Sequence, residues 1–187
     1  MLTPISPIRR PWFLLATTAA MLLCAAPPAD FTVESPVDGS RFHLADAKGR
    51  YVVLHFLLKT ECPYCLRYTR DFAKRGAALK DVQQVFLKPD TADEIRAWSG
   101  KLGDEAPALP IYRDADAALA AAYDIPDGYR FHGQVVHYPA LILLDPTGRE
   151  VFRYVGKDNS DRLSFDKLEA KVSELKSAAG AAPKSKP

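Results

Sequence analysis

The amino-acid sequence predicts an α/β domain in which a central mixed β-sheet is covered by helices on both faces. Residues 51–123 alternate apolar, β-branched runs with amphipathic segments, which is the pattern of parallel strands joined by crossover helices. A strand–turn–strand pattern at 140–155 and a last amphipathic segment from Ser164 complete the domain. With 187 residues, 48% of them apolar and 26% charged, the chain can bury one core.

The first 29 residues have the features of a signal peptide or an N-terminal membrane anchor. Arg9 and Arg10 precede an apolar run at 12–26, which is too short for a comfortable membrane span. Small residues follow it, as they do before a cleavage site, and residues 21–24 weakly resemble a lipoprotein box. We therefore expect an exported, periplasmic or otherwise extracytoplasmic protein, which is tethered to a membrane only if this segment is retained.

The distribution of charge argues against a nucleic-acid partner. Arg9 and Arg10 are the only charged residues before Asp30, so their removal leaves 23 of the 25 basic residues against 23 acidic ones. A neutral domain lacks the basic surface that nucleic-acid binding requires.

The N-terminal part of the domain contains two short strands and a long one. Residues 31–33 and 41–44 are short apolar segments on either side of a turn signal at 38–39, and a polar turn is predicted at 45–50. Residues 51–58 form a near-continuous apolar run, which is typical of a central strand buried on both faces.

Helices and strands then alternate. Apolar residues at helical spacing predict a helix over 66–79, and a strand follows at 82–87. A capping-box sequence at 91–94 predicts the start of the next helix. A short strand is predicted at 109–112 and an alanine-rich helix at 115–123.

The C-terminal part is predicted to be irregular at 125–134 and to form a β-hairpin at 140–155. Ser164 is expected to cap the last helix, whose apolar residues fall on one face. The folded domain is therefore assigned to 30–176, and the small, basic, proline-ended segment 177–187 is expected to be disordered.

The sequence Cys62-Pro63-Tyr64-Cys65 lies where the central strand gives way to a helix, a placement typical of a redox-active dithiol. Free N–H groups at a helix start, and the positive end of the helix dipole, favour a negatively charged sulfur. Lowering a thiol pKa from about 8.5 to about 7 raises the thiolate fraction from a few per cent to about half. This role requires sulfur atoms that are not sealed in the interior.

Two structural explanations of the cysteine pair are less favoured. A zinc site needs two further ligands. His132 and His137, four residues apart, could in principle complete it, but they lie far along the chain. A purely structural disulfide between Cys62 and Cys65 would close a loop too small to remove much chain entropy.

Several segments in order resemble the thioredoxin-like superfamily, and within it the redoxin branch of alkyl hydroperoxide reductase, thiol-specific antioxidant proteins and related exported thioredoxins. These segments are the lead-in at 31–56, the Cys62–Cys65 motif, Tyr138-Pro139-Ala140 and the closing hairpin from 145 to 156. The resemblance covers residues 31–176. It implies a three-layer fold with a redoxin-type N-terminal hairpin and an inserted helix and strand.

The resemblance also implies roles for residues outside the cysteine pair. Pro139 is expected to be a cis proline opposite the dithiol, leaving the backbone of Tyr138 free to pair with a bound chain. Pro63 and Tyr64 would help to position that partner. His55 is a candidate proton relay to the second cysteine, although a hydrogen-bonded core histidine is the simpler interpretation. No cofactor-binding motif is visible, so no cofactor is expected.

Two chemistries are compatible with this site. In disulfide exchange, Cys62 attacks a partner disulfide of a protein or of glutathione, and Cys65 resolves the mixed disulfide. In a peroxidase, Cys65 would react with peroxide and Cys62 would resolve its sulfenate. The peroxidase pattern is incomplete because Leu58 stands where peroxiredoxins carry proline, and Arg67 or Arg130 would have to supply the guanidinium. A non-enzymatic binding module on the same fold is the third hypothesis.

Overall fold

The computed structural model describes residues 30–59, 62–103 and 109–181. Its strands are β1 (Thr32–Glu34), β2 (Arg41–His43), β3 (Tyr51–Phe56), β4 (Val82–Lys88), β5 (Ile111–Arg113), β6 (Tyr129–Phe131), β7 (Gln134–Val136), β8 (Ala140–Leu144) and β9 (Glu150–Val155). Its α-helices are α1 (Pro63–Arg75), α2 (Ala92–Gly100), α3 (Ala118–Ala122) and α4 (Phe165–Ala181), and short 3₁₀ turns lie at Leu44–Ala47, Gly76–Ala78 and Ala115–Ala117.

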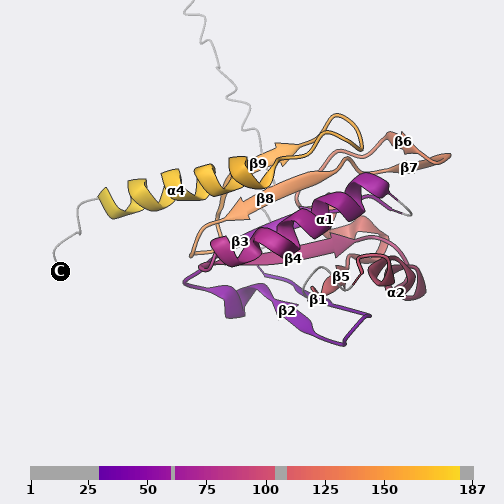
Figure 1. Ribbon diagram of the computed structural model, residues 1–187, viewed down its shortest axis with the longest axis horizontal. Coiled ribbons are helices and arrows are strands. Elements are labelled where there is room, and N and C mark those ends of the chain that lie inside the picture. The colour runs from indigo at the N-terminus through magenta and orange to yellow at the C-terminus, as the bar shows by residue number, and fades with distance from the viewer. Residues whose placement is uncertain (1–29, 60–61, 104–108, 182–187) are drawn as a thin grey trace, which may run out of the picture.

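Five strands form the central sheet in the order β5-β4-β3-β8-β9 (Figure 1). Strands β3, β4 and β5 run parallel, whereas β8 pairs antiparallel with both β3 and β9. The predicted α/β fold with a mixed sheet is therefore confirmed, and the central strand predicted at 51–58 is found as β3, which ends at Phe56. Because β3 and β8 both reach one end of the sheet, the start of α1 and the start of β8 lie close together (Figure 1).

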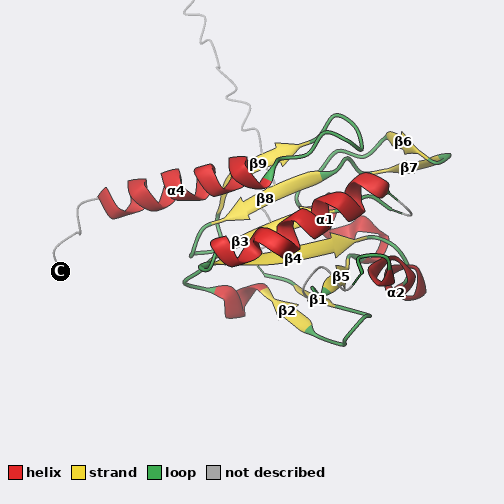
Figure 2. Cartoon of the chain, in the orientation of Figure 1, coloured by secondary structure: helices red, strands yellow, loops and turns green. Residues whose placement is uncertain are grey.

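Two hydrophobic clusters lie on the two faces of this sheet. Alternate residues of β3 enter different clusters, Val53 on one side and Val52 and Leu54 on the other. Helices α1, α2 and α4 contribute to the first cluster, which contains Cys62 and Cys65. Helix α3 and the β1–β2 ribbon cover the second, so helices flank both faces as predicted (Figure 2).

A small hairpin made of β6 and β7 occupies the region that was predicted to be irregular. Its two turn residues, His132 (φ 48°) and Gly133 (φ 77°), are both left-handed, as a type I′ turn requires. The prediction was wrong because histidine rather than asparagine or aspartate precedes the glycine, so the usual turn signal is missing.

Helix α4 continues to Ala181, so the prediction of disorder is wrong for residues 177–181, and residues 182–187 lie outside the described part. Ser177 donates to the carbonyl of Ser173, and Lys176 lies 3.2 Å from Asp81. Alanine-rich sequence and these contacts favour another helical turn. None of the described helices is long and apolar enough to cross a membrane.

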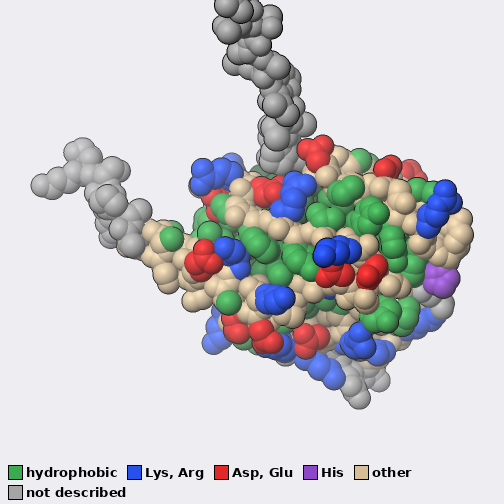
Figure 3. Space-filling model, turned by 90° about the horizontal axis from the view of Figure 1, so that it is seen from above, with side chains coloured by type: hydrophobic (Ala, Val, Ile, Leu, Met, Phe, Trp, Pro, Cys, Tyr) green, Lys and Arg blue, Asp and Glu red, His purple; other side chains and the backbone are tan. Residues whose placement is uncertain are grey.

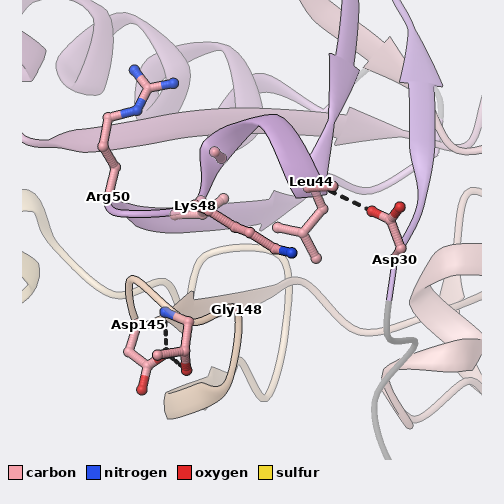
Figure 4. Close-up of a pocket in the computed structure, with 10 residues that line it drawn as sticks. Asp30, Leu44, Lys48, Arg50, Asp145 and Gly148 are labelled. Carbon is pink, nitrogen blue, oxygen red and sulfur yellow. Dashed lines mark hydrogen bonds between the residues drawn. The ribbon is translucent and has the colours of Figure 1, made fainter.

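The surface carries mixed charge. A small cavity lies beside the start of β3, at the opposite end of that strand from the cysteine motif. On the face seen in Figure 3, acidic and basic side chains are interspersed. This cavity of about 100 Å³ opens beside the turn that follows β2, where Lys48 and Arg50 lie across from Asp145 (Figure 4). Asp30 closes its edge by accepting the N–H of Ala45 at 3.1 Å.

A buried ion pair supports the segment that leads from β3 into the cysteine motif. Lys88 at the end of β4 lies 2.6 Å from the Asp90 carboxylate, and both side chains are buried. The same ammonium donates to the carbonyl of Leu58 at 3.0 Å and lies 5.2 Å from the Trp98 ring centre. The pair thus holds the backbone four residues before Cys62.

Replacing Asp90 with alanine should destabilise the domain strongly, because it leaves the Lys88 ammonium buried without its carboxylate. We expect the free energy of unfolding to fall by about 3–5 kcal/mol, measured by urea denaturation. Asp93→Ala, which removes an exposed carboxylate beside Arg96, is the matched control and should cost at most about 1 kcal/mol. Equal losses for the two variants would contradict the structural role of the pair.

Candidate redox site

The cysteine pair is built into the first turn of α1. Cys62 is the N-cap, with extended backbone angles (φ −108°, ψ 109°), and Pro63 occupies the first helical position, where its missing N–H does no harm. The Cys65 N–H donates to Cys62 Sγ at 3.3 Å, so sulfur takes the place of the oxygen that usually caps a helix. Both cysteines are free thiols. The predicted position of Cys62 at the mouth of a helix is therefore found.

The two thiols have opposite acidities. The pKa of Cys62 is lowered to about 6, chiefly because the Cys65 thiol donates a hydrogen bond to its sulfur, and also because of the Cys65 N–H and the charge of Arg162. Burial raises the pKa of Cys65 well above its usual value. At neutral pH the pair therefore holds a Cys62 thiolate beside a protonated Cys65.

Arg162 is the site residue that sequence reasoning missed. Its Nη2 lies 3.0 Å from Cys65 Sγ and 3.8 Å from Cys62 Sγ. Its guanidinium carbon also lies 5.5 Å from the centre of the Tyr68 ring. Nearly 100 residues separate Arg162 from the motif, and no local sequence pattern marks it. One cation therefore contacts both sulfur atoms.

The loop between β9 and α4 is shaped to place Arg162 there. Asp158 accepts the N–H groups of Ser160 and Asp161, and Asp161 in turn accepts the Tyr154 hydroxyl and the N–H of Lys157. At the start of this loop, the backbone of Gly156 packs closely against Pro139 and Asp161.

Gly156 makes that close approach. Its N–H donates to the carbonyl of Pro139 at 2.8 Å. A Cβ at this position would overlap the carbonyl oxygen of Asp161 and would lie 3.0 Å from Pro139 Cγ. No side chain fits at this position, so glycine is required. The loop is thereby held against Pro139 at its start and carries Arg162 at its end.

Both sulfur atoms are covered. Cys62 and Cys65 have no exposed surface, although the adjacent Pro63 is exposed. They belong to the cluster that includes Phe131 of β6 and Val136 of β7, so the hairpin packs over the same core as the dithiol. The expectation that the sulfurs are not sealed in the interior is not met in this conformation. A reaction partner must therefore displace covering side chains before it reaches Cys62.

The prediction of a cis peptide before Pro139 is wrong, since none of the described peptide bonds is cis. The trans form of an X–Pro bond is more stable than the cis form by about 0.5–1 kcal/mol. The backbone groups next to this bond also have hydrogen-bond partners within the chain. The N–H of Tyr138 donates to the carbonyl of Pro126 at 2.9 Å, and the Tyr138 carbonyl accepts from His137 Nδ1 at 2.7 Å. The Tyr138 backbone is thus already paired, contrary to expectation, although Pro139 and Arg162 line the same small cavity.

His55 contacts neither sulfur. Its ring is fully buried, stacks on Phe86 at 4.2 Å between ring centres, and lies between the Tyr68 hydroxyl (2.8 Å) and Gln84 Oε1 (3.0 Å). Because Gln84 Oε1 can only accept, His55 carries its proton on Nε2 and accepts the Tyr68 hydroxyl at Nδ1. Burial lowers the pKa of His55 to about 3. These contacts favour the core-histidine interpretation, and the relay role stays a prediction.

The remaining residues singled out from the sequence are spread around the site. Tyr64 is partly buried in the motif, with the Arg67 guanidinium 5.0 Å from its ring centre. Arg130 is exposed on β6, and Leu58 is buried. The side chains of Tyr64, Arg67 and Arg130 donate to neither sulfur among the described contacts. The backbone of Leu58, by contrast, hydrogen bonds to Cys65 and acts to lower the pKa of that thiol against the effect of burial.

The two histidines considered as zinc ligands do not join the cysteines. His132 is exposed in the β6–β7 turn, whereas His137 is buried against the Tyr138 carbonyl. The described residues contain no group of three His, Cys, Asp or Glu side chains arranged to hold a metal ion.

Comparison with known proteins gives a family match. The sequence profile described as the AhpC/TSA family matches residues 24–151. No curated protein matches the sequence.

Solved structures share the fold. A yeast mitochondrial 1-Cys peroxiredoxin has a TM-score of 0.71 at 14% identity, with 86% of this chain and 79% of that chain covered. An exposed lipoprotein thioredoxin of Streptococcus pneumoniae has a TM-score of 0.63 at 22% identity, with 79% of this chain and 100% of that chain covered. A secreted Mycobacterium tuberculosis disulfide oxidoreductase has a TM-score of 0.57 at 21% identity, with 78% of this chain and 96% of that chain covered. The predicted thioredoxin-like fold is thereby confirmed.

Alkylation should distinguish the two cysteines. The sequence has a third cysteine, Cys24, which is replaced by serine so that it does not react. In this Cys24→Ser background, iodoacetamide should modify Cys62 with a rate that rises through a midpoint near pH 6 and is lost below it, because only the thiolate reacts. Cys65 should stay unmodified through neutral pH, as mass mapping of the labelled peptide would reveal. A common midpoint near the ordinary thiol pKa for both cysteines would contradict the assignment.

Removing the Arg162 charge should make Cys62 less acidic. In Arg162→Gln the alkylation midpoint should rise by about one pH unit, the lower end of the usual range, because the guanidinium is only partly buried. Arg162→Lys, which keeps the charge, should move it less. Gly156→Ala should act in the same direction as Arg162→Gln by displacing the loop. An unchanged midpoint in Arg162→Gln would show that the guanidinium does not act on the sulfurs.

Proposed function

Because the chain belongs to the AhpC/TSA family, we propose that it is an exported thiol-disulfide oxidoreductase that works through Cys62 and Cys65. Thiol-based redox chemistry, by disulfide exchange or as a peroxidase, follows from the family. The finer proposal is carried by one observation: Cys62 Sγ caps α1 and accepts the Cys65 N–H at 3.3 Å. This is the arrangement of an attacking thiolate. Export is proposed from the signal-like composition of residues 1–29.

The reaction would proceed in two steps. The Cys62 thiolate attacks one sulfur of a partner disulfide; that disulfide breaks, a mixed disulfide forms, and the released partner thiolate takes a proton from solvent. Cys65 then loses its proton and attacks Cys62, which releases the second partner thiolate and leaves a Cys62–Cys65 disulfide. Two electrons pass to the partner, and the reverse sequence oxidises a dithiol.

Arg162 supports the harder of these steps. The second step requires a Cys65 thiolate, whose formation burial opposes. A guanidinium nitrogen 3.0 Å from Cys65 Sγ is placed to stabilise that negative charge as it forms. Four residues are proposed to position the partner once it has gained access to the buried sulfurs: Pro63, Tyr64, Tyr138 and Pro139.

A peroxidase is the second candidate, and the same Arg162 contact favours it. A guanidinium beside Cys65 could orient peroxide on that sulfur, and peroxide needs a smaller opening than a protein partner. Against this, burial disfavours the Cys65 thiolate, and Leu58 replaces the proline of the peroxidase pattern. Exchange through Cys62 is therefore preferred.

Insulin reduction and mixed-disulfide trapping test the proposal in the Cys24→Ser protein. Turnover with dithiothreitol should be abolished by Cys62→Ser, and Cys65→Ser should accumulate a stable mixed disulfide at Cys62, seen on non-reducing gels and by mass spectrometry. Glutathione disulfide, offered separately, tests whether that small disulfide serves as the partner.

The competing functions predict other results. Consumption of hydrogen peroxide that is lost chiefly in Cys65→Ser would replace the exchange proposal by the peroxidase. Absence of both activities, with both thiols slow to alkylate, would leave a binding module on this fold.

A further inference from the structure

A groove of about 510 Å³ lies between α3 and the β6–β7 hairpin. Its lining is mixed, with polar and apolar surface in similar amounts, and includes the buried Ala120, Ile125 and Val136. Val135 on its rim is 59% exposed, which is unusual for a large aliphatic side chain in this protein. The cavity is large enough for an amino-acid side chain and part of a backbone.

The rim of the groove is acidic. Asp116, Asp124 and Asp127 are exposed on it, and no lysine or arginine lines it. Within the described part of the chain, none of these carboxylates makes an ion pair. Arg153 reaches the backbone carbonyl of Asp124 at 3.4 Å, but its guanidinium already forms two hydrogen bonds with Glu150, at 2.7 and 2.8 Å. The three carboxylates are therefore placed to meet a cation that a partner brings.

One of the residues that line the groove, His137, has a buried ring nitrogen without a hydrogen-bond partner among the described residues. His137 is only 5% exposed. Its Nδ1 donates to the Tyr138 carbonyl, so the neutral ring presents a lone pair at Nε2, on the opposite edge. That Nε2 has no hydrogen-bond partner among the described residues. Buried polar atoms are rarely left unpaired, so a ligand with N–H donors is the natural complement.

The groove and the dithiol share one wall. Val136 lines the groove and also belongs to the cluster that contains Cys62 and Cys65. His137 is hydrogen bonded to Tyr138, which directly precedes Pro139. Pro139 lines one small cavity with Arg162, whose Nη2 lies 3.0 Å from Cys65 Sγ. A chain seated in the groove would therefore be close to the residues that contact the dithiol.

We propose that this groove binds a lysine or arginine side chain of the disulfide-bearing partner, so that the protein prefers substrates with a basic residue near the reactive cysteine. The cation would meet the carboxylates of the rim, the aliphatic stem would pack along the exposed Val135, and one N–H would pair with His137 Nε2. This inference rests on the proposed exchange function and specifies its substrate class.

Two peptides that differ only in charge provide the test. Each carries one cysteine as a mixed disulfide with thionitrobenzoate, whose release is followed by its absorbance, and has arginine or glutamine three residues from the cysteine. In a single turnover, with the prereduced Cys24→Ser protein in excess and its Cys62–Cys65 dithiol supplying the two electrons, the second-order rate constant should be about five- to tenfold higher for the arginine peptide at low salt. About 1 M salt should remove the preference.

Variants locate the effect. The double variant Asp124→Asn/Asp127→Asn should bring the arginine-to-glutamine ratio close to one, whereas Asp46→Asn, an exposed aspartate of the N-terminal region, should keep it. Equal rates for the two peptides with the parent protein, or an unchanged ratio in the double variant, would overturn the proposal.

A cysteine-free arginine peptide separates this inference from the exchange function. Its binding to the Cys62→Ser/Cys65→Ser protein, followed by NMR shifts at Ala121, Val135 and His137, needs no redox chemistry. Failure of both disulfide peptides to react, with such binding intact, would refute the exchange and leave the groove. A normal reaction of the glutamine peptide without such binding would refute the groove and leave the exchange function.

Discussion

The hydrogen bond from the Cys65 N–H to Cys62 Sγ is the contact on which the site depends. An N-cap side chain normally satisfies a free N–H with oxygen. Here sulfur accepts it, and it accepts better as a thiolate, so the start of α1 and the charge of Cys62 stabilise one another. Pro63 adds a preset backbone angle at the first helical position. A local helix signal therefore also fixes the chemistry of the first cysteine.

The second cysteine is controlled from outside the motif. Cys65 lies deeper and is kept protonated by burial, while Arg162 reaches it from a loop nearly 100 residues later. The loop depends on the absence of a side chain at Gly156, which lets it pack against Pro139. The unequal acidities of the two sulfurs thus come from two sources, helix geometry for Cys62 and tertiary packing for Cys65. They give exchange its order, with attack by Cys62 before resolution by Cys65.

The parts predicted correctly from the sequence are those with local causes. The β3 strand follows from a continuous apolar run, the start of α2 from a capping box that the structure contains, and the cysteine motif from its place between strand and helix. Arg162 could not be predicted, because its role arises from loop packing that leaves no periodic or short-range signal. The β6–β7 hairpin was missed because His132 adopts a left-handed conformation that asparagine or aspartate usually marks.

Burial of the sulfurs connects the active site to recognition. A covered dithiol strengthens the effect of Arg162, because charges interact more strongly away from water, yet the cover excludes a protein partner. A ligand can shift such a closed state only by binding the open one more tightly. The β6–β7 hairpin both packs over the dithiol cluster, through Phe131 and Val136, and forms a wall of the acidic groove. A partner held in that groove therefore contacts an element that packs into the same hydrophobic cluster as Cys62 and Cys65.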